Sequence, residues 1–575
     1  MQHQRLLRQA GTWLALAALG LSAFAAEPTT QRDTSYGRVL GSDDSAATGT
    51  YFWKGVPFAK PPVGDLRWRA PVDPEAWKGV KTTQTFGNAC ASSGRLYGPG
   101  ENNKYDATIG TSYGQTVGSE DCLFLNIWRP ATPTEKLPVI VFIHGGSNVT
   151  GYTADPVYDG AALARTANAV VVTVNYRLGV LGFFRSPQLK TGSLQEDSGN
   201  FALLDLIKSL LFINKNIGNF GGDAGNVTIM GQSAGAVNVY ALLTSPLIAR
   251  ANPTLVHRAI PLSGGIARAE DVPARVLPVI YPPAVFEQQA NLLLTSLVIA
   301  DGLATDAAGA ETYIASRRAE QNAAYMRSKS ADAILQVVLT KLKSANLGGS
   351  NPIPDGAVLP VHPTRAITAG QYAKVPMLIG ITRDEVKLFP QLLVLLGAPN
   401  GRLLTDPQAF AMAYSYDPNA EPATKLRDWI PASLLPTKTM ETGFNARTNL
   451  LNHYWFIPGR DSVIAAMKTQ QNNIWTYRFD WDQEPAPFNE IFGAAHGFDL
   501  PFIFGNFGPS TWANFVNTKA NAPGRLALSN AMMRSIGAFA LKGDPNDAAL
   551  GVAWPTWPRT LLLNASPSAK NITVQ

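Results

Sequence analysis

The chain has 575 residues, of which 46% are hydrophobic and 16% are charged, and this composition excludes a disordered or fibrous protein. The length suits either several domains or a single large α/β unit. The formal net charge of +6 is small for this size and no run of Lys and Arg stands out, so the sequence does not indicate a nucleic-acid partner.

The N-terminal segment, residues 1–26, is predicted to be a secretory signal peptide. It has a basic start and an apolar, helix-prone run over residues 13–24, and its small residues predict cleavage after about Ala25 or Ala26. A membrane anchor is the alternative, but the apolar run is shorter than the ~20 residues that a span needs. No later segment is long and apolar enough to span. We therefore expect a secreted or periplasmic protein without a membrane span.

The first part of the mature chain is predicted to contain short strands and turns. Residues 36–53 alternate and turn like β-hairpins. The only two cysteines are Cys90 and Cys122, and in an exported protein such a pair most simply forms one disulfide. The bond would restrict a loop rich in Gly, Ser, Asn and Tyr, contributing on the order of 3–4 kcal/mol in the chain-entropy model. Two free thiols are the alternative.

Short apolar runs further along the chain are typical of strands covered on both faces. They span residues 137–143, 169–174, 227–230, 259–262, 375–381 and 474–479. Helical patterns lie between them, for example over residues 201–217 and 526–541. Alternating strands and helices favour the α/β class, with a large, mostly parallel central sheet flanked by helices.

A candidate nucleophile follows the strand predicted at residues 227–230. The pentapeptide Gly231-Gln232-Ser233-Ala234-Gly235 stands between this strand and a helix-like run at residues 236–243. Strand, G-x-S-x-G and helix form the context of the nucleophile elbow, in which a strained turn exposes the serine hydroxyl at the carboxyl edge of the sheet. The motif predicts a serine hydrolase in which Ser233 attacks a carbonyl group.

A serine hydroxyl needs a base within hydrogen-bond reach and a third group that orients the base. In this fold type the chain order is Ser, then Asp or Glu, then His. Of the six histidines, His496 stands in a loop of small residues after the last predicted strand. The acid should close a strand between Ser233 and His496, and the strand at residues 375–381 runs into Asp384 and Glu385. Composition does not choose between these two carboxylates.

An oxyanion hole needs backbone N–H groups that converge on the developing negative charge. Gly145 and Gly146 come directly after His144 at the end of the strand at residues 137–143, and they carry no Cβ that would obstruct the backbone. The N–H of Ala234, the residue after the candidate nucleophile, supplies another donor. The three residues are therefore the candidate oxyanion hole.

Two segments are expected to be insertions in one domain that spans residues 27–575. Residues 288–342 are largely helical by pattern, whereas residues 389–447 begin with an apolar segment and continue with proline-rich loops. Both lie beside candidate catalytic segments, so a cap over the active site is one interpretation. Plain core packing explains their apolar content equally well.

Longer stretches resemble the type-B carboxylesterase/lipase family, the cholinesterase-like branch of the α/β-hydrolases. They are spread over nearly the whole mature chain. They lie at residues 55–62 (GVPFAKPP), 119–128 (SEDCLFLNIW), 175–179 (NYRLG), 199–205 (GNFALLD), 219–223 (NFGGD) and 496–505 (HGFDLPFIFG). The resemblance implies an α/β-hydrolase fold with helical cap insertions.

The resemblance also implies a role for individual residues. The family's functional positions fall on the nucleophile Ser233, the acid Glu385, the base His496, the oxyanion-hole residues Gly145, Gly146 and Ala234, and the disulfide partners Cys90 and Cys122. A serine that supports the triad from behind falls on Ser263. The resemblance thus favours Glu385 over Asp384 as the acid.

The sequence departs from the family pattern at three places. The glycine that usually follows the triad acid is Val386 here. Ser147 and Asn148 follow the paired glycines, where many members carry Gly or Ala and then an aromatic residue, and this change is expected to make the rim of the oxyanion hole more polar. The loop between the cysteines lacks the Trp with which choline-selective members bind a cation, which argues against a choline ester as substrate.

The sequence therefore predicts an exported serine carboxylesterase that forms an acyl-enzyme on Ser233. The expected substrate is a small-molecule or lipid-like ester, and the chemistry needs no metal or organic cofactor. Action mainly on amides, lactones or thioesters through the same triad is one alternative. A cholinesterase-like binding module without activity is the other. The oligomeric state is left open.

Overall fold

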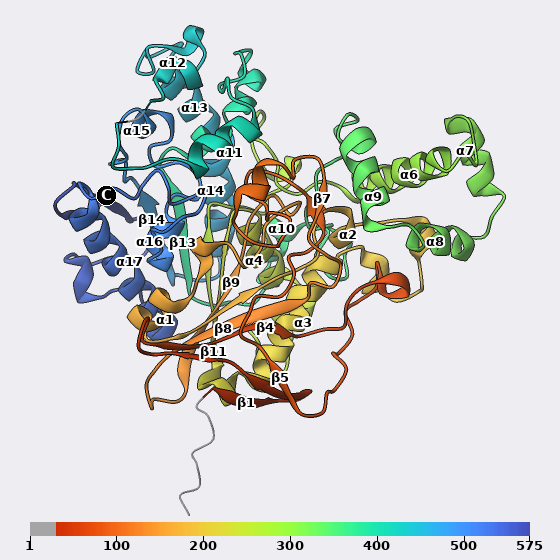
Figure 1. Cartoon of the computed structure of the whole chain (residues 1–575), viewed down its shortest axis with the longest axis horizontal. Helices are drawn as coiled ribbons and strands as arrows, with labels where there is room; N and C mark the ends of the chain where they lie inside the picture. Colours follow the sequence, from red (N-terminus) through yellow and green to blue (C-terminus); the bar gives the residue numbers. More distant parts are fainter. Residues whose placement is uncertain (1–29, 422) are drawn as a thin grey trace, which may run out of the picture.

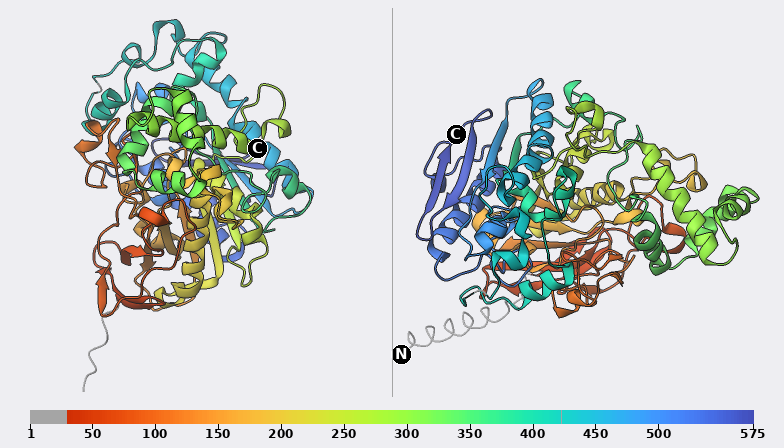
Figure 2. Two further views of the ribbon diagram at one scale, coloured as in Figure 1. Left: turned by 90° about the vertical axis from the view of Figure 1, so that its right-hand side faces the viewer. Right: turned by 90° about the horizontal axis from the view of Figure 1, so that it is seen from above.

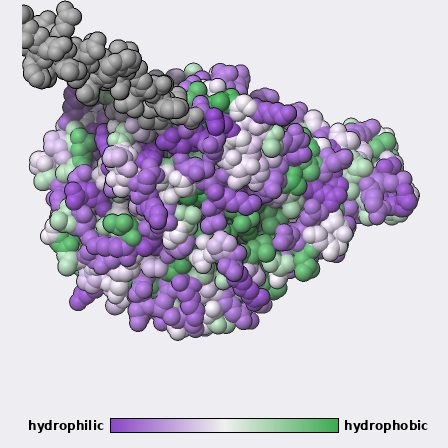
Figure 3. All heavy atoms as spheres, turned by 90° about the horizontal axis from the view of Figure 1, so that it is seen from below, coloured by the Kyte–Doolittle hydropathy of each residue, from purple (hydrophilic) through white to green (hydrophobic). Residues whose placement is uncertain are grey.

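The computed structural model describes residues 30–421 and 423–575. The predicted signal peptide, residues 1–26, lies outside the described residues. Hydrophilic residues cover most of the face in Figure 3, with hydrophobic ones in small groups. No helix in the described ranges has both the length and the apolar character that crossing a membrane requires.

A large twisted sheet organises the part of the chain that the structure describes (Figures 1 and 2). Its eleven strands there follow the order β16-β15-β14-β13-β12-β11-β9-β10-β8-β4-β3. The bounds are β3 Ser42–Asp44, β4 Thr50–Pro57, β8 Phe124–Pro130, β9 Leu137–Ile143, β10 Val170–Val174, β11 Gly222–Gln232, β12 Arg258–Leu262, β13 Met377–Thr382, β14 Ile474–Phe479, β15 Thr560–Ala565 and β16 Lys570–Val574. Strands β10, β9, β11, β12, β13, β14 and β15 are parallel, and the outer pairings are antiparallel.

The carboxyl ends of the parallel strands meet at one edge of the sheet, and the candidate residues lie there. β9 ends just before His144, β11 ends at Gln232, and β13 ends three residues before Glu385. An α/β sheet binds ligands at this edge because the loops that follow the strands converge on it. The topology thus brings together residues that are far apart in the sequence.

Helices cover both faces of the sheet (Figure 2). On one face pack α1 Ala161–Ala167, α16 Leu500–Phe504 and α17 Ala522–Lys542, and on the other α3 Phe201–Asn216, α4 Ala234–Thr244, α10 Pro363–Thr368 and α14 Phe456–Lys468. Neighbouring residues of β9 illustrate the two layers, because Val141 packs into one hydrophobic core and Phe142 into the other. Burial on both faces explains why these strands are continuous apolar runs.

The remaining elements are short or belong to the insertions. They are β1 Gln31–Thr34, β2 Gly37–Leu40, β5 Val80–Thr82, β6 Ser92–Ser93, β7 Thr116–Val117, α2 Gly179–Gly182, α5 Pro246–Ala249, α6 Pro283–Ala300, α7 Ala307–Ala315, α8 Ala319–Arg327, α9 Ala331–Val337, α11 Asp406–Tyr414, α12 Leu426–Trp429, α13 Phe444–Asn452 and α15 Phe488–Ile491. Strands β1, β2 and β5 form a small separate sheet, and β6 pairs with β7.

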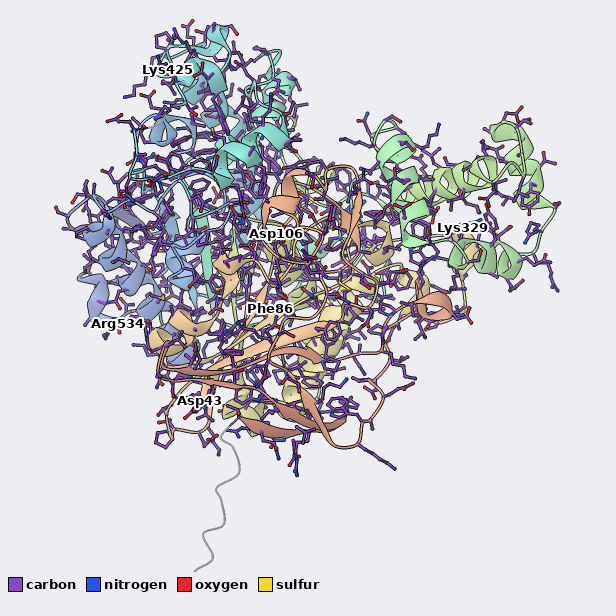
Figure 4. All side chains as sticks on the ribbon, in the orientation of Figure 1. Asp43, Phe86, Asp106, Lys329, Lys425 and Arg534 are labelled. Atoms are coloured by element: carbon purple, nitrogen blue, oxygen red, sulfur yellow. A yellow bond between two sulfur atoms is a disulfide. The ribbon has the colours of Figure 1, made fainter. Side chains whose placement is uncertain are left out.

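The segment at residues 288–342 lies in a helical arm, α6 to α9, that projects to the right in Figure 1 and shares a hydrophobic cluster with residues of the body such as Phe184 and Phe201. Arg67 ties this arm to the body. Its guanidinium pairs with Glu120 at 2.5 Å and donates to the carbonyl of Lys329, which is labelled in Figure 4, at 2.6 Å. The segment at residues 389–447 lies at the top of Figure 1 and contains α11, α12 and the start of α13.

The predicted fold class is confirmed. The strand predicted at residues 137–143 and the one at residues 474–479 coincide with β9 and β14. The predicted disulfide is present between Cys90 and Cys122, whose Cα atoms lie 4.9 Å apart. It joins the residues before β6 to the residues before β8, so the chain that contains β6 and β7 is closed into a loop at the sheet.

Candidate active site

Ser233 sits on a strained turn between β11 and α4. Its φ is +58° and its ψ is −124°, a conformation that side chains rarely adopt. The flanking glycines permit the turn, because a Cβ at Gly231 would overlap the carbonyl of Gly235, and a Cβ at Gly235 would overlap the carbonyl of Ile143. The motif's small residues are therefore needed for close packing, and the turn presents Ser233 to a cavity.

The carboxylate of Glu385 meets the imidazole of His496. Glu385 Oε2 lies 2.5 Å from His496 Nδ1, and both side chains are almost fully buried. The other carboxylate oxygen of Glu385 accepts from the Ser263 hydroxyl at 2.6 Å and from the Thr382 N–H at 2.7 Å. Three donors thus fix this carboxylate. They also fix the tautomer, because a carboxylate at Nδ1 requires the ring proton there.

Asp384, the other carboxylate left open by composition, points elsewhere. It pairs with Arg383 at 2.7 Å and accepts from the Ala494 N–H at 3.2 Å. The Asp384 N–H also donates to the Ala494 carbonyl at 2.9 Å. Asp384 therefore joins the loop that carries Glu385 to the loop that carries His496, and it does not contact the imidazole.

The other ring nitrogen of His496 faces Gln232. His496 Nε2 lies 3.0 Å from Gln232 Nε2. Within residues 30–421 and 423–575, the Ser233 hydroxyl has no hydrogen-bond partner. The ring of His496 also packs against Phe389 and Phe456, with centroids 5.1 and 4.9 Å apart. The sequence motif contains Gln232 but gives no sign that it would reach a histidine 264 residues away.

The candidate oxyanion hole lies directly against the serine. A Cβ on Gly145 would come within 2.9 Å of Ser233 Cβ, and Gly146 has a φ of +106°. Ala234 opens α4, where the first N–H groups of a helix lack internal partners. In the described part of the chain, no acceptor takes the N–H of Gly145, Gly146 or Ala234. These donors are free to bind an anionic oxygen beside Ser233.

The loop after Gly146 is fixed from behind by a polar network. Asn148 Oδ1 accepts from Asn238 Nδ2 at 2.9 Å and from the Tyr176 hydroxyl at 3.2 Å. Tyr176 also donates to the His144 carbonyl at 2.8 Å. Burial lowers the pKa of His144 to about 4, so this imidazole is neutral at neutral pH and packs on the Tyr176 ring. The network joins the oxyanion loop to α4.

This network corrects one expectation about the rim of the oxyanion hole. Asn148 is fully buried and does not line the cavity, whereas Ser147 does. Both residues have a positive φ, and this turn directs the amide of Asn148 inward to Tyr176 and Asn238. Ser147 alone can add polarity at the rim.

The cavity in front of Ser233 has a volume of about 230 Å³. Its wall includes the aromatic residues Tyr281, Phe389, Trp455 and Phe456. In the described residues no Asp, Glu, Lys or Arg side chain lines it, and none of its lining residues comes from residues 288–342. Residues 30–421 and 423–575 contain no group of three or more His, Cys, Asp or Glu side chains placed to bind a metal.

The fold, a large mixed sheet flanked by helices with a serine on the turn between β11 and α4, is that of an α/β-hydrolase. The model of the carboxylesterase family matches residues 28–571, so the chain belongs to that family. It is by class a carboxylic ester hydrolase. The predicted family resemblance is confirmed.

Individual relatives are similar over nearly their whole length. Para-nitrobenzyl esterase of Bacillus subtilis is 32% identical, over 94% of this chain and 95% of its own. Fumonisin B1 esterase of Sphingopyxis macrogoltabida is 32% identical, over 95% and 88%. A solved thermophilic PNB esterase superposes with a TM-score of 0.69 at 28% identity, covering 95% of this chain and 98% of that one.

Proposed function

We propose that the protein hydrolyses carboxylic esters through an acyl-enzyme on Ser233. One observation carries the proposal: the elbow presents Ser233 to a cavity whose wall includes Phe389 and Phe456, and these two rings pack on His496, which is paired with Glu385. His496 accepts the proton of Ser233 as the serine oxygen attacks the ester carbonyl, and Glu385 stabilises the imidazolium. Gly145, Gly146 and Ala234 would bind the oxyanion.

In the next steps His496 acts as a general acid and gives up the proton that it took from Ser233. The imidazolium protonates the alcohol oxygen as its bond to the carbonyl carbon breaks, which leaves the acyl group on Ser233. A water molecule then attacks the acyl carbonyl, with His496 again as the base. The imidazolium then returns this proton to the Ser233 oxygen as its bond to the acyl carbon breaks, which releases the acid and restores the serine.

The lining of the cavity favours neutral esters with an apolar alcohol. His496 must reach the leaving alcohol, so the side chains around the imidazole border the alcohol site. These are aromatic, since Phe389 and Phe456 contact the ring and Trp455 packs at a tilt beside Phe456 with centroids 4.4 Å apart. A charged alcohol or acyl group would lose its hydration without gaining a partner.

Replacement of the nucleophile tests this function. Ser233→Ala should lower kcat for a short p-nitrophenyl ester by about 10⁶-fold, as in measured serine-protease triads. Ser529→Ala is the matched control, since Ser529 is buried on α17 and donates to the Phe502 carbonyl away from the cavity. A Ser233→Ala enzyme with near wild-type turnover would refute the proposal.

Paired substrates and a covalent probe separate the alternatives. An ester and an amide with the same acyl group show whether the triad acts mainly on amides. A fluorophosphonate should label Ser233 in the wild-type protein and not in Ser233→Ala. Absence of labelling together with absence of turnover would favour a binding module.

We further propose that the protein is exported and that its signal peptide is cleaved after about Ala25 or Ala26. The Cys90–Cys122 disulfide supports this proposal, because such bonds persist in oxidising compartments. The intact mass of protein recovered outside the cytoplasm should correspond to a chain that starts at Ala26 or Glu27. A chain that still begins with Met1 in that fraction would contradict cleavage.

A further inference from the structure

Gln232 lies between the two halves of the catalytic machinery. It is the last residue of β11, and its side chain is 1% exposed. Its amide nitrogen lies 3.0 Å from His496 Nε2, and its amide oxygen lies against Gly145, where a Cβ would come within 2.9 Å of it. The amide therefore spans from the base to the oxyanion loop.

The proton on Nδ1 determines which way this amide faces. Because Nδ1–H donates to Glu385, Nε2 of the neutral ring carries a lone pair and accepts. The partner at 3.0 Å must then be a donor, and the amide NH₂ is the donor of a glutamine. The lone pair that should receive the Ser233 proton is thus occupied in the resting structure.

Few titratable groups face the imidazole. Glu385 accepts from Nδ1, and Phe389 and Phe456 cover the ring. Asp499 is a buried carboxyl near the Glu385–His496 pair, and its pKa is raised to about 6, mainly by burial. It accepts from the Tyr477 hydroxyl at 2.8 Å. Gln232 is the neutral group on the Nε2 side.

We propose that Gln232 is a positioning residue that holds His496 in its resting state and yields it to Ser233 when substrate binds. The inference rests on the proposed esterase function. The amide donates to the neutral imidazole and cannot donate to the imidazolium, which carries a proton on both nitrogens. A hydrogen bond made only to the neutral form disfavours the charged form. The geometry therefore pairs Gln232 with the neutral form of the imidazole.

The proton transfer requires this contact to change. When the Ser233 oxygen bonds to the ester carbon, its proton moves to His496 Nε2, and Nε2–H then meets the amide NH₂. The Gln232 amide therefore has to leave Nε2 as the proton arrives, and this is the step at which it yields the imidazole to Ser233.

The acid limb of the kcat/KM profile tests this role, because it reports the base of the free enzyme. Gln232→Met keeps the shape and removes the donor, so the acid limb should move to higher pH by about 0.5–1 unit. Gln232→Glu places a carboxylate at Nε2 that favours the charged ring, and the limb should move further, by about 1–2 units. Gln471→Met is the matched control: Gln471 donates to the Val375 carbonyl at 2.8 Å, far from His496.

The same comparison can be made with the rate at which a neutral fluorophosphonate labels Ser233, which depends on the base and needs no turnover. An acid limb that coincides in wild type, Gln232→Met and Gln232→Glu overturns the inference, even if all rates fall. If Gln232→Met does not fold, the direction of the Gln232→Glu shift decides. Lack of any esterase activity in the wild-type enzyme would instead refute the proposed function.

Discussion

The acid of the candidate triad is held by more than its histidine. The Ser263 hydroxyl and the Thr382 N–H both donate to the Glu385 oxygen that faces away from His496. Ser263 has a φ of +54°, so its backbone is in the left-handed region. Such a conformation is tolerated where it directs a side chain to a specific partner, and here the partner is the Glu385 carboxylate that contacts His496.

Removal of this hydroxyl should therefore slow catalysis without weakening substrate binding. A hydrogen bond to a charged group contributes about 1.5–3 kcal/mol, so Ser263→Gly should lower kcat about 10- to 100-fold while KM stays similar. Glycine suits the positive φ, whereas Ser263→Ala adds backbone strain. Steady-state kinetics on a p-nitrophenyl ester measure the effect. Wild-type kcat in Ser263→Gly would show that Thr382 suffices to hold Glu385.

At the scale of elements, the sequence predicts what depends on local pattern. The apolar run at residues 137–143 is buried on both faces, and its bounds match β9. β11 was predicted over residues 227–230 but begins at Gly222, because Gly222 pairs with Leu137 ahead of a register shift. Polar residues such as Asp223 have low strand propensity, and pairing with a neighbouring strand overrides that propensity.

In the candidate site, too, local sequence patterns predict some features, whereas contacts between distant segments determine others. G-x-S-x-G and the paired glycines locate the elbow and the oxyanion loop because their backbone needs small residues there. Composition does not distinguish Asp384 from Glu385 as the acid, since both follow the same strand. The turn after β13 directs Glu385 to His496 and Asp384 to the Ala494 N–H. The side-chain amide of Gln232 contacts His496, and that of Asn148 contacts Asn238. Both partners are far away in the sequence, so no local pattern predicts these contacts.

At the scale of the whole molecule, folding buries some carboxyl groups that have no ionic partner within the described residues. Asp155 lies at the start of a short 3₁₀ turn, Pro156–Tyr158, and accepts from the Val157 N–H at 3.0 Å. Burial raises its pKa from 3.8 to about 7. The folded protein thus retains a proton that the unfolded chain releases near pH 4. Stability must then fall as pH rises from about 4 to about 7 through this group.

Asp155→Asn should remove this pH dependence, because asparagine keeps an acceptor for the Val157 N–H and carries no charge. A rise in pKa from 3.8 to about 7 corresponds to roughly 4 kcal/mol at pH 8, and to much less at pH 5, where the folded carboxyl is still protonated. The variant should therefore unfold at a higher temperature than wild type at pH 8, with a smaller advantage at pH 5. Thermal unfolding at both pH values measures the difference.

The control for this experiment is Asp43→Asn, because Asp43 is an exposed carboxylate (Figure 4) whose pKa is lowered by the Ser45 hydrogen bonds. Its replacement should not give a gain at pH 8. Equal advantages of Asp155→Asn at pH 5 and pH 8 would mean that packing, and not ionisation, separates the variant from wild type. A loss of stability at pH 8 would mean that the buried carboxylate has a stabilising partner when charged. Only a gain in unfolding temperature that is larger at pH 8 than at pH 5 agrees with a buried Asp155 that stays protonated in the folded protein.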